Sequence, residues 1–285
     1  MSRFTKRHSV HGQEVYDTTD SEFVAKGGFV AGGEKSIGRQ GGNIVLPGNP
    51  GTVAYFDDFL GDLIADEWNY AESDTGHDAA AVRAQTNGVV RLHLSSTAPK
   101  TPAARAVLNH GLFPQWKADQ GDLRMSARLK INDLTGANVF IGFADTGAAI
   151  MPLYDTGGNS GNGVPLAQAS NAVGFLYSGG AASPSTAWRG VAVNADTVAT
   201  SPVSGDAPTA NTYDALELIF GDTGSGNDGD IVYFRQGGAL KGSIKNPVLS
   251  TRAMVPVLAA FASEDTGNVI DLDYVNPSAR RDTGE

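Results

Sequence analysis

Paired carboxylates are the residues of this chain whose type and spacing could do chemistry. Asp271 and Asp273 stand two positions apart in the last segment that alternates apolar and polar residues. Such spacing puts both side chains on one face of a strand, about 6.5–7 Å apart, and glycoside hydrolysis needs two carboxylates that flank a bond. No glutamate follows at a matching position. We therefore interpret the pair as outward carboxylates of the last strand, with Ile270, Leu272 and Tyr274 pointing inward.

Calcium binding is the second interpretation of these acids. Ca²⁺ takes about six to eight oxygen ligands, and Asp57 and Asp58 would join Asp271 and Asp273 if the first and last strands of the folded part pair. No loop has the ligand spacing of an EF-hand, which leaves these residues as weak calcium candidates. The five histidines lack metal-ligand spacing, and the chain has no cysteine. The sequence thus predicts no cofactor and no metal ion, and it shows neither a Gly-x-Ser-x-Gly nor a phosphate-loop motif.

Aromatic side chains offer a further kind of site, because their flat rings can stack on sugars. Tyr177 and Trp188 are the candidate glycan contacts, with the polar, glycine-rich loop at 151–168 beside them. Packing in the core or at the rim is the commoner role of such rings in a β-sandwich, and both interpretations stay open. Arg91 and Arg128 are interpreted as solvated outward positions rather than as a basic face.

Composition and charge narrow the class of protein. The chain has 285 residues, of which 36 are glycine and 13 proline, and 41% are apolar. This favours a sizeable core built from short strands joined by turns. The formal net charge of −10 is opposite to that of most nucleic-acid binders, which need lysine and arginine for phosphate contacts. No apolar run reaches the length that spans a bilayer, about 20 residues, and the basic N-terminus lacks the apolar stretch of a secretory signal. We expect neither nucleic acid nor membrane as a partner.

The periodicity of the chain predicts an all-β fold, an antiparallel β-sandwich. Residues 89–94 and 123–131 alternate over their whole length, as one-sided strands do. Apolar segments at 138–143 and 256–261 are typical of buried strands. Further strands are expected at 105–108, 172–177, 188–193, 213–220, 230–234 and 269–275. Because helical periodicity is almost absent, these strands imply two packed antiparallel sheets.

The first 52 residues differ from the rest of the chain. They carry glycine pairs and mixed charges but few contiguous apolar residues, too few for a segment that folds alone. They are either a flexible tail or an extended N-terminal arm that becomes ordered on a partner. The apolar anchors of such an arm would be Tyr16, Phe23, Phe29, Ile44 and Leu46. We divide the chain into an arm and linker at 1–52, a sandwich at 53–277 and a C-terminal tail at 278–285.

The segment at 53–277 resembles the concanavalin A-like lectin/glucanase jelly roll. The resemblance is carried by residues 55–59 with Glu67 and Trp68, by 123–131 leading into 140–143, by 173–176, and by the acidic closing strand at 269–275. Members often open with a Phe-x-Asp-x-Phe segment followed by Trp, and close with a strand like Ile-Asp-Tyr-Val. The glucanase branch carries Glu-x-Asp-x-x-Glu on one strand, and this chain does not have that motif. From its absence we expect no catalytic residues and a protein that is not an enzyme.

A narrower resemblance is to virion structural proteins of tailed bacteriophages, which often join a glycine-rich N-terminal arm to a lectin-like β domain. The arm followed by Phe56-Asp-Asp-Phe59-Leu-Gly-Asp looks like the start of such a protein. The resemblance implies a capsid decoration (cement) protein on the capsid surface, made in the host cytoplasm. Its arm and one sandwich face would bridge subunits of the major capsid protein, as a homo-oligomer (trimer or dimer). The alternatives are a carbohydrate-binding module of a head fibre or tail, used for host adsorption, and a glucanase-like hydrolase, which the missing motif disfavours.

Overall fold

Strands make up nearly all of the regular structure. The computed structural model describes, with side chains, residues 59, 68–70, 88–94, 105–109, 116–145, 151–154, 169–179, 187–199, 202–224, 229–263 and 267–280, and describes further strands by their backbone pairing alone. Within these ranges the one helical element is a 3-10 turn at Ala118–Gln120. No helix among the described residues is long and apolar enough to cross a bilayer. The chain is all-β, as predicted.

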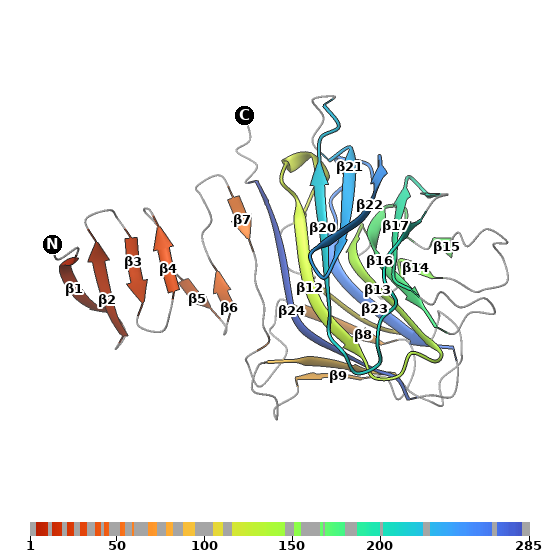
Figure 1. The fold of residues 1–285 in the computed structure, drawn as a ribbon, viewed down its shortest axis with the longest axis horizontal. Helices are drawn as coiled ribbons and strands as arrows, with labels where there is room; N and C mark the ends of the chain where they lie inside the picture. The colour runs from red at the N-terminus through yellow and green to blue at the C-terminus, as the bar shows by residue number, and fades with distance from the viewer. Residues whose placement is uncertain are drawn as a thin grey trace.

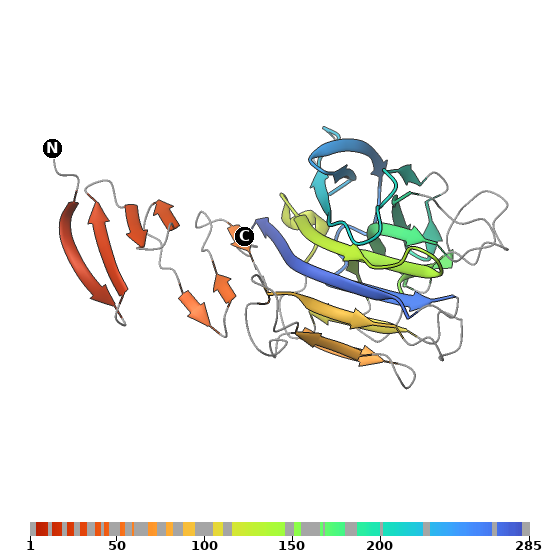
Figure 2. The same ribbon diagram turned by 60° about the horizontal axis from the view of Figure 1, so that its bottom comes forward.

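One antiparallel sheet, which we name the β12 sheet, contains the closing strand of the chain. Its order is β22 (Ala239–Lys245), β21 (Ile231–Gln236), β20 (Asp214–Gly221), β12 (Arg124–Ile131), β24 (Val269–Arg280), β10 (Val90–His93) and β9 (Asp78–Ala81). A further strand, β7 (Thr52–Ala54), pairs with the C-terminal end of β24. In Figure 2 the blue β24 runs between the yellow-green β12 and the orange strands β10 and β9. The last strand of the chain therefore lies at the centre of its sheet.

The second layer of the sandwich is the β13 sheet. Its order is β18 (Thr197–Val198), β17 (Arg189–Asn194), β16 (Ala172–Ser178), β13 (Ala137–Ala144), β23 (Val255–Ala262), β11 (Ala106–His110) and β8 (Trp68–Glu72). The short β19 (Val203–Ser204) also pairs with β17. Figure 1 shows the two sheets as the two layers of one body.

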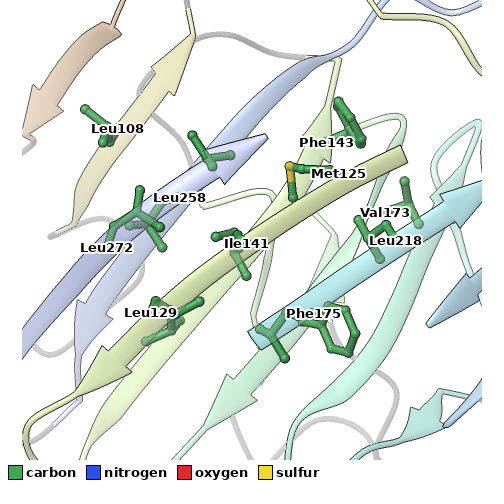
Figure 3. Close-up of a cluster of buried hydrophobic side chains, with 14 of the residues drawn as sticks. Leu108, Met125, Leu129, Ile141, Phe143, Val173, Phe175, Leu218, Leu258 and Leu272 are labelled. Atoms are coloured by element: carbon green, nitrogen blue, oxygen red, sulfur yellow. The ribbon is translucent and has the colours of Figure 1, made fainter. Parts of the chain in front are cut away.

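The core lies between the two sheets. Alternation along β12 sends Met125 and Leu129 inward, where they belong to one cluster with Ile141 and Phe143 of β13 and Phe175 of β16. These labelled side chains fill the space between the layers in Figure 3. Burying a large apolar side chain stabilises a fold by about 1.5–3 kcal/mol, so this cluster is the main reason why the two sheets stay packed.

The strands that the periodicity predicted between residues 89 and 275 are all present. The sequence missed β22, which has no apolar run but pairs with β21 across Gly237 and Gly238. Both glycines have positive φ, 57° and 80°, as a two-residue hairpin turn of this kind requires. The predicted surface loop at 151–168 also contains a short strand pair, β14 (Leu153–Tyr154) with β15 (Leu166–Ala167).

The closing strand departs from strict alternation at its centre. The sequence predicted Tyr274 to point inward with Leu272, and this is wrong. Leu272 pairs with Leu129 while Tyr274 pairs with Arg128, so β24 has one extra residue, Asp273, at this point. A β-bulge of this kind shifts the following residues to the opposite face. Tyr274 is therefore half-buried on the outer side, and the next residue along the strand enters the core.

The N-terminal residues form strands of their own. Four of them make an antiparallel sheet: β1 (Phe4–Val10), β2 (Gln13–Thr18), β3 (Glu22–Ala25) and β4 (Phe29–Gly32). Two more, β5 (Gly38–Gln40) and β6 (Asn43–Val45), pair with each other. None of these strands belongs to the β12 or the β13 sheet (Figure 1). The sandwich itself begins with β7, across the predicted boundary at 52, and continues past 277 to the end of β24, where Ala279 is fully buried.

Candidate functional site

The β13 sheet is covered on its outer side as well as on its core side. The strands β13 and β16 are buried at every position. Their outward residues, with those of neighbouring strands, form a second cluster that we call the apolar face: Val107, Phe140, Ala144, Leu176, Val191, Val193, Val257, Ala259 and Phe261. Met151 and Leu153 are buried in the same cluster, and the ring of Tyr154 meets that of Phe261 edge-on, with centroids 6.4 Å apart. The segment around β14 is thus part of what covers this sheet.

A glycine pair allows this face to pack closely. Gly142 and Gly174 stand opposite each other on β13 and β16. A Cβ built on Gly174 would lie 2.4 Å from the carbonyl oxygen of Ile141 and 2.8 Å from ring atoms of Phe140. Because real Cβ atoms do not approach other atoms so closely, the ring of Phe140 can take this position only over a glycine.

Three polar side chains on the outer side of the β13 sheet each have an oxygen atom without a hydrogen-bond partner, although the Nδ2 atom of Asn138 donates to the carbonyl of Gly136 at 3.2 Å. Asn138 and Ser178 are cross-strand neighbours on β13 and β16, and Asn109 lies on β11. Each residue is at most 1% exposed, yet the Oδ1 atoms of both asparagines and the Oγ atom of Ser178 have no partner. A buried polar group without a partner costs about 1–3 kcal/mol. Sequence reasoning missed this set, although a polar residue at the end of an otherwise apolar strand is a signal that could have found it.

The outer side of the β12 sheet is ionic, and we call it the charged face. Arg91 donates from Nε and Nη2 to the two oxygens of Asp271, at 2.6 and 2.9 Å. The Nζ atom of Lys130 lies 3.2 Å from the same carboxylate. Arg128 donates from Nη1 to Asp273 at 2.7 Å. The hydrogen bonds from Arg91 to Asp271 raise the pKa of that guanidinium, which keeps the arginine protonated.

Tyr213 lies among these charges. The guanidinium carbon of Arg128 is 4.5 Å from the centre of the tyrosine ring, and the Nζ atom of Lys130 is 5.0 Å from it. Burial, followed by the charges of Asp271 and Asp273, raises the pKa of Tyr213. The phenol therefore stays neutral beside the carboxylates, and its ring face remains a site for cations.

The predicted role of the closing acids needs one correction. Asp271 and Asp273 point outward, as predicted, but their side chains are only 1% and 11% exposed. Arg91 and Arg128, which we interpreted as solvated positions, are their ion-pair partners. Of the four calcium candidates, Asp271 and Asp273 pair with arginine and lysine side chains. The other two, Asp57 and Asp58, lie outside the described residues. No group of three or more possible metal ligands occurs in the part of the chain that the structure describes.

The two predicted glycan contacts lie in the core. Trp188 is 0% and Tyr177 4% exposed, and their rings pack together with centroids 5.7 Å apart. The indole Nε1 of Trp188 donates to Asp214 at 2.9 Å, and the hydroxyl of Tyr177 donates to the carbonyl of Leu134 at 3.3 Å. Of the two interpretations left open by the sequence, the structure places both rings in the core and not at a surface where they could stack on a sugar. Their hydrogen bonds explain why such amphipathic residues are tolerated inside.

The predicted anchors of the N-terminal arm fall on or beside its strands. Tyr16 lies on β2, Phe23 on β3, Phe29 on β4 and Ile44 on β6. Leu46 lies outside the described residues. Contact of these residues with a capsid stays a prediction.

Comparison with known proteins gives matches at the level of structure. No known family and no curated protein matches the sequence. A prokaryotic beta-1,3-1,4-glucanase (lichenase) derived from a mouse hindgut metagenome matches with a TM-score of 0.51 and 10% identity, over 79% of this chain and 98% of that one. The laminarinase from Rhodothermus marinus gives 0.51 and 13%, over 80% and 97%. The carbohydrate recognition domain of Emp47p gives 0.51 and 10%, over 80% and 94%. The fold is the concanavalin A-like jelly roll, as the sequence predicted.

The prediction that the chain is not an enzyme is contradicted by these matches. β-Glucanases and laminarinases, which are hydrolytic enzymes, make up most of the similar structures. The prediction rested on the absence of Glu-x-Asp-x-x-Glu. Since glycoside hydrolysis requires two suitably placed carboxylates rather than one particular linear motif, that absence was too narrow a criterion.

Proposed function

We propose that this chain is a structural protein of a bacteriophage virion, a capsid decoration protein that bridges subunits of the major capsid protein on the capsid surface. The observation that supports the proposal is the division of the chain into two sets of strands. The strands β1–β6 pair only among themselves, whereas the sandwich is completed by β7 pairing with β24. Such a chain has one part free to attach to a partner and another that is complete without it.

Attachment would use main-chain hydrogen bonds at the edge of a strand together with apolar side-chain contacts. A strand edge presents main-chain donors and acceptors that can pair with a strand of a partner, and the anchors Tyr16, Phe23, Phe29, Ile44 and Leu46 would supply apolar contacts. Each bridging protein adds contact area between capsid subunits and so raises the free energy of separating them. A homo-oligomer, trimer or dimer, would repeat this bridge around a capsid symmetry axis.

Removal of residues 1–50 tests the proposal, because the remaining chain keeps all of β7. We expect the shortened protein to unfold at the same temperature as the full sandwich and to lose binding to purified capsids. The full chain with Tyr16→Ser and Phe23→Ser should bind weakly, and the full chain with Arg124→Ala, an exposed change on the sandwich, should bind normally. Normal capsid decoration by the shortened protein would overturn the proposal.

Carbohydrate binding is a second candidate, carried by the unpartnered polar atoms of the cross-strand neighbours Asn138 and Ser178. A hydroxyl-rich ligand could satisfy both, and the apolar face beside them would pack on the less polar side of a sugar ring. Since these atoms are buried, the segments that cover them would have to move before a ligand reaches them. The solved structures of similar fold include a carbohydrate recognition domain as well as glucanases.

A glycan array with the intact protein tests this candidate. We expect Ser178→Ala to abolish any binding that uses the outer side of the β13 sheet, and the matched Ser126→Ala on the β12 sheet to leave it unchanged. Binding that survives Ser178→Ala would count against the site. Release of reducing sugar from a β-glucan in the same preparation would show that the bound glycan is also cleaved.

A further inference from the structure

The ion pairs of the charged face share one orientation: the cation lies above the acid. Arg91 is 39% exposed and Asp271 1%, and Arg128 is 43% exposed and Asp273 11%. Solvent or a partner therefore meets guanidinium groups first, with the carboxylates beneath them. The opposite orientation occurs elsewhere in the sandwich, where Lys241 is 18% exposed and its partner Asp206 63%. The same orientation recurs at Arg252, which is 55% exposed above a 1% exposed Asp145. What distinguishes the charged face is that two such arginines lie on the strands that flank β24.

The cations of this face are also held in place before any ligand arrives. Arg128 is fixed by Asp273 and by the ring of Tyr213, and Lys130 lies between Asp271 and the same ring. Arg91 and Arg128 still have N–H donors that bond to no described residue. A binding site whose side chains are already ordered avoids about 0.5–1.5 kcal/mol of entropy loss per side chain on binding.

We propose that the charged face binds an acidic polysaccharide, whose anionic groups accept hydrogen bonds from Arg91 and Arg128 while its rings lie on Tyr213 and Tyr274. Guanidinium groups match planar oxyanions in shape and charge, and tyrosine offers an apolar ring with a polar edge to a sugar. Binding here is independent of the capsid proposal and uses the sheet opposite to the second candidate site.

The balance of charge favours an acidic sugar over a nucleic acid. Each phosphate contact of a nucleic acid requires an available lysine or arginine, and here Asp271 and Asp273 already neutralise two of the cations. The chain as a whole carries a net charge of −10, which repels a dense polyanion. A polysaccharide presents separate anionic groups divided by uncharged ring surface, which suits cations that alternate with tyrosine rings.

Calorimetric titration of the full chain with oligogalacturonates tests the proposal. We expect binding that Arg128→Gln weakens by about tenfold or more, the loss for one charge-assisted contact of about 1.4 kcal/mol. The matched control is Arg252→Gln, because Arg252 is 55% exposed and also pairs with a nearly buried carboxylate, Asp145, at 3.3 Å. Both variants remove one charge and leave one buried acid, so thermal unfolding should register similar changes while only Arg128→Gln loses the ligand.

Several outcomes would overturn the proposal. They are no measurable binding of oligogalacturonate by the unaltered protein, an equal loss of affinity in Arg252→Gln, and equally tight binding of poly-glutamate or of single-stranded DNA. Retention of binding in Arg128→Lys at a level between those of the unaltered protein and Arg128→Gln would support it, since lysine keeps the charge but not the planar pair of donors. Neutral glucans should bind the same with or without Arg128→Gln.

Discussion

The two sheets of this sandwich share one core but have opposite outer sides. On the β13 sheet the outer side is a second apolar interior, in which Phe140 and Leu176 are fully buried. On the β12 sheet it is a layer of ion pairs, with arginines above nearly buried aspartates. The difference shows that the outer side of a sheet can be covered either by a further apolar layer or by ion pairs held in fixed positions.

The sequence pattern already distinguishes the two sheets. A strand buried on one side alternates, whereas a strand buried on both sides has a continuous apolar run. The burial along β12 alternates at every step, and all positions of β13 are buried. The solvent-facing side of an alternating strand such as β12 tolerates charged residues, and the ionic cluster lies on that side.

The largest expected effect tests whether the apolar face is a true interior. Phe140→Ala should reduce the free energy of unfolding by about 3–5 kcal/mol, because it removes a buried ring and leaves a cavity. Arg124→Ala, an exposed change on the β12 sheet, should alter it by no more than about 0.5 kcal/mol. Urea denaturation of both variants measures the difference. Similar small losses in both would show that the second apolar layer contributes nothing to stability.

How far the sequence could predict the fold depends on the range of the interactions involved. Alternation and apolar runs predicted the strands that flank the core, because one-sided or two-sided burial is encoded locally. The bulge at Asp273 was not predictable, since it arises from the pairing of β24 with β12, which are distant in sequence.

The candidate site residues were likewise predictable only where the signal is local in the sequence. The sequence left Trp188 and Tyr177 open between a glycan contact and packing in the core, because the hydrogen bonds that let them enter the core come from Asp214 and Leu134, which are distant in sequence. Asn138 and Ser178, each with one unpartnered oxygen, become neighbours only when β13 and β16 align, and this pairing cannot be recognised in the sequence.

Loss of a fixed cation should cost less than loss of the apolar layer. Arg91→Gln removes two hydrogen bonds from a carboxylate that is 1% exposed, and we expect a loss of about 1–3 kcal/mol. Lys130 still pairs with Asp271 in this variant, which limits the loss of stability. Arg235→Gln is the control, because Arg235 lies 3.7 Å from a half-exposed Glu217 and such a pair contributes at most about 1 kcal/mol. Equal losses in the two variants would mean that burial of Asp271 is not what makes its pair important.

A gain in stability, in place of a loss, is expected when an unpartnered polar atom of the β13 sheet is removed. Ser178→Ala should raise the free energy of unfolding by about 1 kcal/mol, since it deletes a buried hydroxyl whose oxygen has no partner. Stabilisation combined with loss of glycan binding would indicate a residue kept for function at a cost in stability. A destabilised Ser178→Ala protein would show instead that the hydroxyl has a structural role.

The smallest expected effect concerns alkaline pH. Burial raises the pKa values of Tyr177, Tyr213 and Tyr274 in the folded protein. In the unfolded chain a tyrosine loses its proton at about pH 10. Between that pH and the higher folded values the folded protein binds more protons than the unfolded chain, so its stability falls as pH rises. Thermal unfolding from about pH 9 to about pH 11 should show this fall, and Tyr177→Phe, on the β13 sheet, should make it shallower. An unchanged slope in that variant would mean that the Tyr177 hydroxyl, although buried in the core, ionises as easily as it does in water.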